Sequence, residues 1–410
     1  MNDNSNKHNK KIIGSIIKLN RINQNISQKN LCKGICVPSY LSRIENGELI
    51  PSEDVISIIF SKLGLSFNNS EVFIEKGKKA FEEFFHNLNF NEYDFTNTLF
   101  EQIEAKEEEY IASTLIIDYY IAKLARYCST SERNKFEDTK NLLYSAFDLL
   151  TSKQKFLYNF YVGIDIFNIF DNKTKGKEYI LRALDYNKNG HCYFWLSYAY
   201  TLENNPIKAY DCIKKALDLY VTEGNILSIM DSYSKIAEVY FMLDNYIDAL
   251  DYLKKSINMA YKIGNKHNIE HLNTLIAWSY YRLNDYKTSL AYLNKNKGLL
   301  DHRMIIPDSV IKSLIYFTTK DKKCLQLSIS ELNNPASLNQ INKELANAFY
   351  DFYSFYIEND DYLDNNICEH LLLNIIKNIH KSVELNKVFK SFLKDYYIHN
   401  RRYKDALYIS

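Results

Sequence analysis

The sequence has little glycine and proline, with 11 glycines and 5 prolines among 410 residues. Strand-rich folds need frequent turn residues, and doubly wound sheets need glycine at their crossovers, so this scarcity argues against both. It also excludes collagen-like and proline-linker proteins. Hydrophobic residues make up 46% and charged residues 25%, which excludes a disordered chain. We therefore expect an all-α fold of helices joined by short polar loops.

The sequence also lacks a disulfide framework, a membrane span and the common enzyme motifs. The seven cysteines are scattered and odd in number, so we expect reduced thiols rather than a disulfide framework. No apolar run approaches the roughly 20 residues of a membrane span, and the N-terminus is polar, which predicts a cytoplasmic protein without membrane contact. The sequence contains no glycine-rich phosphate loop, nucleophile elbow or kinase signature. We expect no enzymatic activity, no cofactor and no metal.

The charge is distributed unevenly along the chain. The formal net charge is only +1, but residues 1–65 carry +4 and the remainder carries −3. A basic segment followed by a mildly acidic one suggests contact with a polyanion near the N-terminus. A chain of this length also exceeds what one hydrophobic core usually serves, so we expect several domains or a repeat array.

Four helices are predicted within the first 65 residues. Apolar residues repeat with helical spacing from residue 12 to 19, and Ser27 can cap a second, short helix. Pro38 suits the first turn of a third helix, which should stop at Gly47. A fourth amphipathic helix is predicted to follow Ser52.

The stretch ISQKNLCKGICVPSYLSRIENGELIPSEDVISIIFSKLGL, residues 26–65, resembles the xenobiotic-response-element (XRE) class of helix-turn-helix DNA-binding domains. The form with Ile35-Cys36 at the turn is similar to the subset in peptide-pheromone regulators of low-GC Gram-positive bacteria. The resemblance implies that the third helix enters the major groove, where Arg43 can contact guanine. The alternative is that Arg43 pairs with Glu45 or Glu48 on the surface. The predicted DNA-binding residues are Ser27, Gln28, Ser39, Tyr40, Ser42, Arg43 and Asn46.

An aromatic helix is predicted from residue 71 to 88, with Phe73, Phe81, Phe84 and Phe85 at helical spacing. It can pack between two chains or against the next helical layer. Residues 96–110, 111–127 and 135–150 follow as further helices. We accordingly expect a DNA-binding domain at 1–66, a linker and dimerisation helix at 67–95, and a repeat domain at 96–410.

Internal repeats are the second strong signal. Residues 199–217, 239–257 and 279–297 align without gaps at offsets of 40, which superimposes Tyr200, Tyr240 and Tyr280. Each unit reads as two antiparallel helices. The pattern resembles the tetratricopeptide repeat, although the period is longer and residues 300–395 match poorly. The resemblance implies a right-handed α-superhelix whose inner surface is lined by the first helix of each pair.

That inner surface is predicted to bind an extended peptide, with aromatic pockets and polar groups for the peptide backbone. The alternative is that several of these side chains pack between repeats, and we expect about half to touch ligand. The predicted peptide-binding residues are Tyr158, Tyr161, Asp165, Asn168, His191, Phe194, Tyr198, Asp231, Glu238, Phe241, His271, Trp278, Tyr281 and Arg282.

Head and repeats together resemble the cytoplasmic peptide-pheromone receptors of the Rap, Rgg, NprR, PlcR and PrgX class. The resemblance implies a quorum-sensing transcriptional regulator, acting as a homodimer on a pseudo-palindromic operator in double-stranded DNA and controlled by a short signalling peptide. The alternative is a Rap-like regulator that binds a response regulator or kinase. Such a protein could be bifunctional and bind DNA as well. A phosphatase role would need a positioned amide or acid, for which Gln102 is conceivable.

Two local patterns suggest other chemistry. Residues 267–271, HNIEH, match the H-x-x-E-H zinc-peptidase pattern, but short patterns arise by chance and we favour surface or groove roles for His267 and His271. Cys32 and Cys36 could form a redox switch, although helix two and its turn normally bury those positions.

Overall fold

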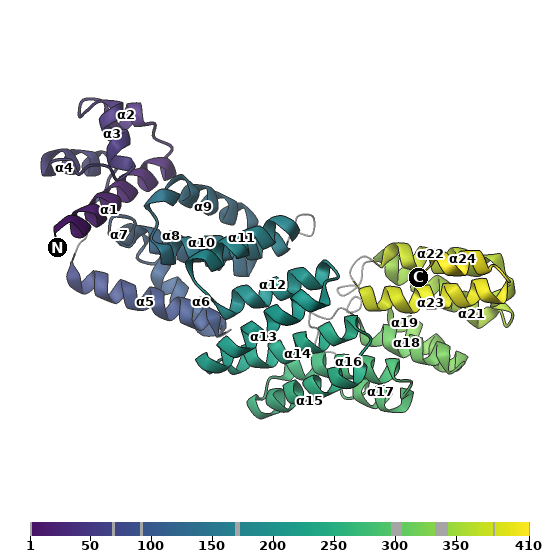
Figure 1. Cartoon of the computed structure of the whole chain (residues 1–410). Coiled ribbons are helices and arrows are strands. Elements are labelled where there is room, and N and C mark those ends of the chain that lie inside the picture. The colour runs from purple at the N-terminus through teal and green to yellow at the C-terminus, as the bar shows by residue number, and fades with distance from the viewer. Residues whose placement is uncertain are drawn as a thin grey trace. The chain divides into compact units, whose positions relative to one another are not determined.

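The computed structural model describes residues 2–67, 70–90, 93–168, 173–296, 306–332, 343–379 and 382–409. Every regular element within these ranges is a helix, which confirms the predicted all-α fold (Figure 1). The helices fall into two compact units. Unit 1 comprises Met1–Leu202 and Asp218–Leu227, and unit 2 comprises Glu203–Leu217 and Ser228–Ser410.

Unit 1 begins with the N-terminal head, residues 2–62, and continues into the first helices of the body. Its helices are α1 (Asn2–Asn23), α2 (Gln28–Cys32), α3 (Pro38–Glu45), α4 (Glu53–Lys62), α5 (Glu71–Asn89), α6 (Tyr93–Glu104), α7 (Glu107–Ile111), α8 (Ile116–Thr130), α9 (Arg133–Ser145), the 3-10 helix η1 (Phe147–Leu149), α10 (Ser152–Asn168), α11 (Lys173–Tyr186) and α12 (Gly190–Leu202). The last turns of α13 (Pro206–Glu223) also belong to it.

The four helices predicted for the head are present. Ser27 caps α2, because its hydroxyl oxygen accepts a hydrogen bond from the Asn30 amide at 3.1 Å. Gly47 ends α3 with φ +70°, a conformation that glycine adopts without strain. Gly14 lets α1 cross α3 closely, since a Cβ there would collide with the Ile44 carbonyl oxygen. Local capping and backbone chemistry therefore set these helix boundaries.

The body of unit 1 differs from the prediction at two places. The helix expected at 96–110 is two helices, α6 and α7, with a break at Ala105 and Lys106, and the helix expected at 135–150 ends at Ser145 and is followed by η1. The boundary expected between residues 110 and 111 lies a few residues later, around Ser113, whose hydroxyl oxygen accepts a hydrogen bond from the Leu115 amide at 3.2 Å. That local bond competes with helix continuation.

The aromatic side chains of α5 pack within the same chain. Phe73 and Phe81 lie 5.2 and 5.0 Å from Tyr110 between ring centroids, and Phe84 lies 5.7 Å from Phe100. These aromatic side chains thus contact the next helical layer of their own chain.

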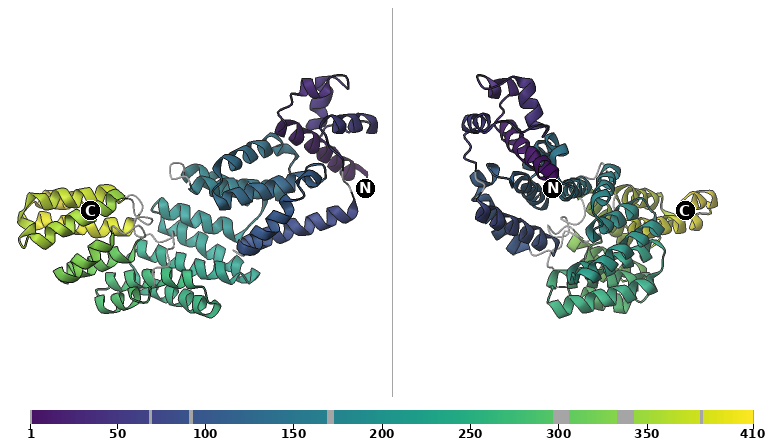
Figure 2. Two further views of the ribbon diagram at one scale, coloured as in Figure 1. Left: turned by 180° about the vertical axis from the view of Figure 1, so that it is seen from behind. Right: turned by 60° about the vertical axis from the view of Figure 1, so that its left-hand side comes forward.

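Unit 2 contains the central repeats and the C-terminal helices. It includes the first part of α13, then α14 (Ile226–Met242), α15 (Tyr246–Ile263), α16 (Lys266–Arg282), α17 (Tyr286–Leu293), α18 (Asp308–Thr318), α19 (Lys322–Leu332), α21 (Lys343–Glu358), the 3-10 helix η2 (Tyr362–Asp364), α22 (Asn366–Asn378), α23 (Val383–His399) and α24 (Tyr403–Tyr408). Figure 2 shows the C-terminal helices in yellow, packed side by side.

The 40-residue repeat is visible in backbone geometry. Asn204, Asp244 and Asn284, at matching positions, have φ values of 53°, 55° and 63°. The following residue in each repeat caps the next helix through its side-chain oxygen, as Asn245 does for the Asp248 amide at 3.2 Å. Asparagine and aspartate tolerate the left-handed conformation, so each repeat turns sharply there.

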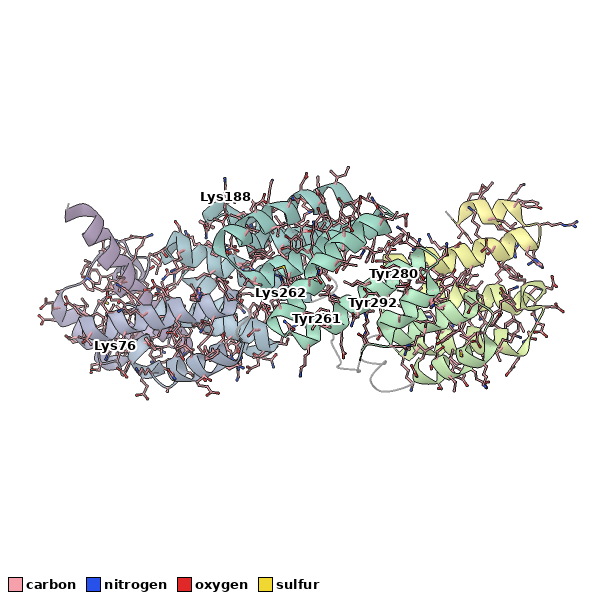
Figure 3. All side chains as sticks on the ribbon, turned by 90° about the horizontal axis from the view of Figure 1, so that it is seen from below. Lys76, Lys188, Tyr261, Lys262, Tyr280 and Tyr292 are labelled. Carbon is pink, nitrogen blue, oxygen red and sulfur yellow. The ribbon has the colours of Figure 1, made fainter. Side chains whose placement is uncertain are left out.

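Tyrosine stacking joins the two helices within a repeat. Tyr240 stacks on Tyr252 at 5.7 Å, and the equivalent rings of Tyr280 and Tyr292 lie 5.8 Å apart (Figure 3). Helix pairs also continue through α18–α24, where the sequence matches the repeat poorly. There the spacing of apolar residues, rather than a repeated motif, maintains the packing.

Candidate functional site

The outward face of α3 carries the residues predicted to meet DNA bases. Ser39 and Arg43 are exposed, as is Asn46 just after the helix, while Tyr40 and Ser42 are partly exposed. The opposite face is buried, through Leu41, Ile44 and Glu45. In α2 the capping Ser27 is exposed and Gln28 is partly exposed. Val37, which precedes α3, is 62% exposed.

A buried ion pair fixes α3 from behind. The Glu45 carboxylate, 1% exposed, accepts hydrogen bonds from Arg21 Nε at 2.5 Å and Arg21 Nη2 at 2.8 Å. Gln28 Nε2 donates to the same carboxylate at 2.7 Å. These donors satisfy the buried charge and tie α1 and α2 to α3. They also engage the Gln28 side chain, which is partly exposed.

Arg43 makes one ion pair, and it lies on the surface. Its Nε is 3.3 Å from Glu48 Oε2, with the two side chains 61% and 52% exposed. The alternative pairing with Glu48 is therefore present, whereas Glu45 is held by Arg21. An exposed pair at this distance contributes roughly 0 to 1 kcal/mol, so it constrains Arg43 little.

Some of the predicted peptide-binding residues of unit 1 are buried, and others are partly exposed. Tyr158, Tyr161 and Asp165 are buried, and the side chain of Asn168 lies outside the described residues. Burial raises the pKa of Asp165, and its Oδ2 has no hydrogen-bond partner among the described residues. The partly exposed members are His191, Phe194 and Tyr198.

His191 is held by a tyrosine. Its Nδ1 lies 3.0 Å from the Tyr220 hydroxyl, and burial lowers the pKa of the imidazole to about 4. The ring is therefore neutral at physiological pH. A neutral, largely buried imidazole suits hydrogen bonding rather than recognition of an acidic group.

Unit 2 shows the same division. Phe241, Trp278 and Tyr281 are buried. The partly exposed members are Asp231, Glu238, His271 and Arg282. Glu238 pairs with Lys235 at 2.6 Å, and Asp231 accepts a hydrogen bond from Asn268 at 3.4 Å.

The first turn of α23 reaches Arg282, which the sequence did not predict. Glu384 Oε2 lies 3.3 Å from Arg282 Nη1 and accepts a hydrogen bond from the Tyr246 hydroxyl at 2.7 Å. Lys387 contacts Asp244 at 3.1 Å. Residues more than 100 positions apart form this cluster, so no local sequence pattern could reveal it.

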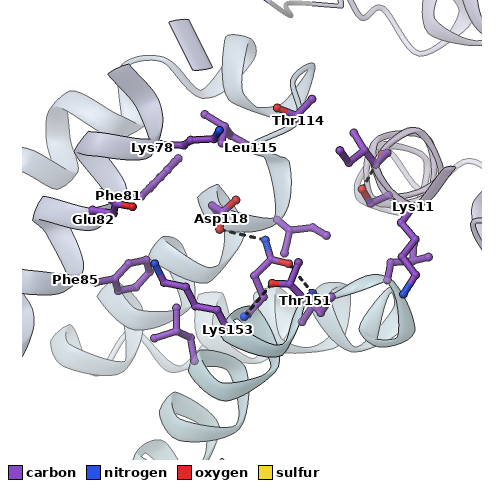
Figure 4. Close-up of a pocket in the computed structure, with 17 residues that line it drawn as sticks. Lys11, Lys78, Phe81, Glu82, Phe85, Thr114, Leu115, Asp118, Thr151 and Lys153 are labelled. Atoms are coloured by element: carbon purple, nitrogen blue, oxygen red, sulfur yellow. Dashed lines mark hydrogen bonds between the residues drawn. The ribbon is translucent and has the colours of Figure 1, made fainter. Parts of the chain in front are cut away.

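A cavity of about 610 Å³ lies in unit 1 between α1, α5, α8 and α10. Its wall is mainly apolar, with Phe81, Phe85 and Leu115, and Asp118 lies within it (Figure 4). Gln154 Nε2 donates a hydrogen bond to Asp118 at 3.1 Å, and burial raises the pKa of that carboxyl. Beside the cavity the first helix of the head contacts the body directly, since Asn20 Nδ2 donates a hydrogen bond to the Ile111 carbonyl oxygen at 2.7 Å.

The geometry gives little support to the zinc-peptidase, redox-switch and phosphatase alternatives. Glu270 of the H-x-x-E-H pattern is buried, His271 is partly exposed, and the His267 side chain lies outside the described residues. The part of the chain that the structure describes contains no group of three or more metal-ligating side chains. Cys32 is buried and Cys36 is partly exposed, both as free thiols, and burial raises the pKa of Cys36. Gln102 is exposed on α6.

None of the described helices has the length and hydropathy needed to cross a membrane.

Comparison with known families matches two regions of the chain. Residues 17–68 match the helix-turn-helix family, and residues 228–295 match the tetratricopeptide repeat family. A search of curated protein sequences finds no match. The chain therefore contains one region similar to helix-turn-helix domains and one similar to tetratricopeptide repeats.

Several solved structures share this fold. A Rap protein complexed with competence and sporulation factor has a TM-score of 0.65 and 13% identity, covering 82% of this chain and 96% of that one. The apo quorum sensor NprR from B. thuringiensis has a TM-score of 0.62 and 14% identity, covering 82% and 99%. NprR with its cognate peptide NprX has a TM-score of 0.56 and 16% identity, covering 81% and 98%. The predicted resemblance to the Rap and NprR class is confirmed in domain content and fold.

Proposed function

We propose that this protein is a quorum-sensing transcriptional regulator, which binds promoter DNA through α2 and α3 and responds to a short signalling peptide bound by its repeats. The proposal rests on the arrangement of side chains on the two faces of α3. Ser39, Arg43 and Asn46 are exposed, while the Arg21–Glu45 pair fixes the buried side of the helix. Such a face suits major-groove readout, because a rigid helix presents short polar and basic side chains to base edges.

The contacts divide by chemistry. Arg43 makes a bidentate contact with guanine, worth roughly 1 to 3 kcal/mol of discrimination. Ser39, Tyr40 and Ser42 contact neighbouring bases and backbone. Ser27, Asn46 and the backbone amide of Gln28 hold phosphates, which sets the register without reading sequence.

The repeats bind the peptide through their accessible side chains. Aromatic members supply apolar contact and the polar ones hold the peptide backbone. The buried members of the predicted set position the helices that carry them. NprR, which has the same fold, has been solved in complex with its cognate peptide. The accessible members are His191, Phe194, Tyr198, Asp231, Glu238, His271 and Arg282.

The functional division follows the chain order. Residues 1–66 bind DNA, 67–95 support a homodimer, and 96–410 bind the ligand. A homodimer in the cytoplasm places two copies of α3 roughly 34 Å apart on a pseudo-palindromic operator. The peptide acts by binding one arrangement of the dimer better than another. No catalytic step or cofactor is part of the proposal.

Selection from a random pool of double-stranded DNA tests the DNA-binding half. The purified protein should enrich one motif with two related half-sites, and Arg43→Ala should lower affinity for it roughly 5- to 150-fold, from the energy of one guanine contact. Arg182→Ala, which removes an exposed arginine of α11, is the control and should bind normally.

If the wild-type protein enriches no motif, or Arg43→Ala binds the motif as tightly as wild type, the proposed DNA-binding face is wrong. A Rap-like role would then be favoured if a response regulator or kinase binds the wild-type protein and the Arg43→Ala protein equally.

A further inference from the structure

The first turn of α23 places a carboxylate among donors that come from two repeats. Glu384 Oε2 accepts a hydrogen bond from the Tyr246 hydroxyl at 2.7 Å and lies 3.3 Å from Arg282 Nη1. Its Oε1 is 3.3 Å from Lys387 Nζ. The Glu384 side chain is only 13% exposed. Unit 2 therefore contains a largely buried pocket of donors around one carboxylate.

The donors are held in place without help from Glu384. The guanidinium carbon of Arg282 lies 4.7 Å from the centre of the Tyr246 ring and 5.9 Å from that of Trp278. Asp244 Oδ1 lies 3.5 Å from Arg282 Nη2 and 3.1 Å from Lys387 Nζ. Stacking and the second carboxylate orient both cations, so the site stays formed when its occupant leaves.

Glu384 fits this site poorly. Its contacts with Arg282 and Lys387 are both 3.3 Å, and Oε1 makes no hydrogen bond within the described part of the chain. The Arg21–Glu45 pair in the same protein is bidentate, at 2.5 and 2.8 Å. A carboxylate with incomplete hydrogen bonding is readily displaced by another carboxylate that can form two parallel hydrogen bonds with the guanidinium.

We propose that Tyr246, Arg282 and Lys387 form a carboxylate-binding site, that Glu384 fills it in the free chain, and that a ligand carboxylate takes its place. The ligand class is a carboxylate-terminated or acidic peptide, and this last step rests on the proposed function. Replacing the Glu384 carboxylate with a ligand carboxylate leaves the net charge of the site unchanged. Glu384 is the second residue of α23, so opening the first turn of that helix is sufficient to release it.

Chemical rescue tests the site without knowledge of the natural ligand. Glu384→Ala empties it, and propionate is the probe, with propionamide as the uncharged control of the same shape. The chain has two tryptophans, so Trp195→Phe leaves Trp278, beside Arg282, as the only indole reporter.

Propionate should change the Trp278 fluorescence of the Glu384→Ala, Trp195→Phe protein saturably at about 1 to 50 mM, as suits a ligand of five non-hydrogen atoms. It should also raise the unfolding temperature. Propionamide, and chloride at equal ionic strength, should do neither. The Trp195→Phe protein with Glu384 intact should respond only at higher propionate concentrations, because propionate must displace Glu384. Adding Arg282→Ala to the emptied protein should abolish the response.

Equal responses to propionate and propionamide, no response of the emptied protein, or a response that survives Arg282→Ala would overturn the proposal. If Glu384→Ala does not fold, a double-mutant cycle with Arg282→Lys and Glu384→Gln replaces it, and additive effects on unfolding would overturn the proposal. None of these measurements involves DNA, so their failure is distinct from failure of the regulatory function.

Discussion

Removing Arg21 should strongly destabilise the N-terminal head, because it leaves the Glu45 carboxylate buried with a single amide donor. Glu45 is 1% exposed, and Arg21 supplies two of its three hydrogen bonds. Breaking a buried pair by removing one partner costs about 3 to 5 kcal/mol. Since whole domains are stable by only about 5 to 15 kcal/mol, Arg21→Ala should leave the head only marginally folded.

Hydrogen exchange across residues 12–63 measures this effect locally. Arg21→Ala should speed exchange in α1 and α3 roughly 150- to 5000-fold, whereas Arg43→Ala, which breaks an exposed pair, should change it less than about fivefold. Replacing both buried charges, with Arg21→Met and Glu45→Leu, should recover much of the protection because no charge is left unpaired. Equal exchange in Arg21→Ala and Arg43→Ala would refute the reasoning.

Three smaller perturbations test other parts of the fold. Gly14→Ala should destabilise the head by about 1 to 3 kcal/mol, since the new Cβ meets the Ile44 carbonyl oxygen, and an unchanged unfolding curve would contradict that contact. Burial lowers the pKa of His191 to about 4, so the free energy of unfolding receives its full contribution from the neutral ring above pH 6.5 and falls by up to about 3 kcal/mol towards pH 4. His191→Gln should therefore make the free energy of unfolding depend less on pH between 6.5 and 4. The same pH dependence in the variant and the wild-type protein would contradict this. Tyr246→Phe should speed hydrogen exchange at the start of α23 by roughly 3- to 10-fold through one lost hydrogen bond, while Tyr286→Phe, at the matching repeat position, should leave it unchanged.

Local signals made the head and the repeats predictable. Ser27, Pro38 and Gly47 mark helix ends by backbone chemistry that depends on immediate neighbours. The 40-residue period places Asp244 and Asn284 at equivalent turns, and the structure has both in the left-handed conformation. These elements follow from short stretches of sequence because the interactions that define them are themselves short-range.

The candidate sites were less predictable, because helical periodicity identifies a face and not what covers it. Tyr158 and Trp278 belong to the predicted inner face, yet both are buried by neighbouring helices. Tyr246 and Glu384 are 138 residues apart and meet only in the folded unit. The break between α6 and α7, at Ala105 and Lys106, lies inside a stretch whose apolar spacing predicts one continuous helix.

The central claim is that α3 reads promoter DNA, and genome-wide recovery of DNA crosslinked to this protein tests it most directly. The account predicts discrete sites for the wild-type protein, loss of those sites in Arg43→Ala, and a short gene for a secreted peptide near at least one of them. Absence of discrete wild-type sites in both peptide-rich and peptide-poor cultures, or persistence of the same sites in Arg43→Ala, would contradict it.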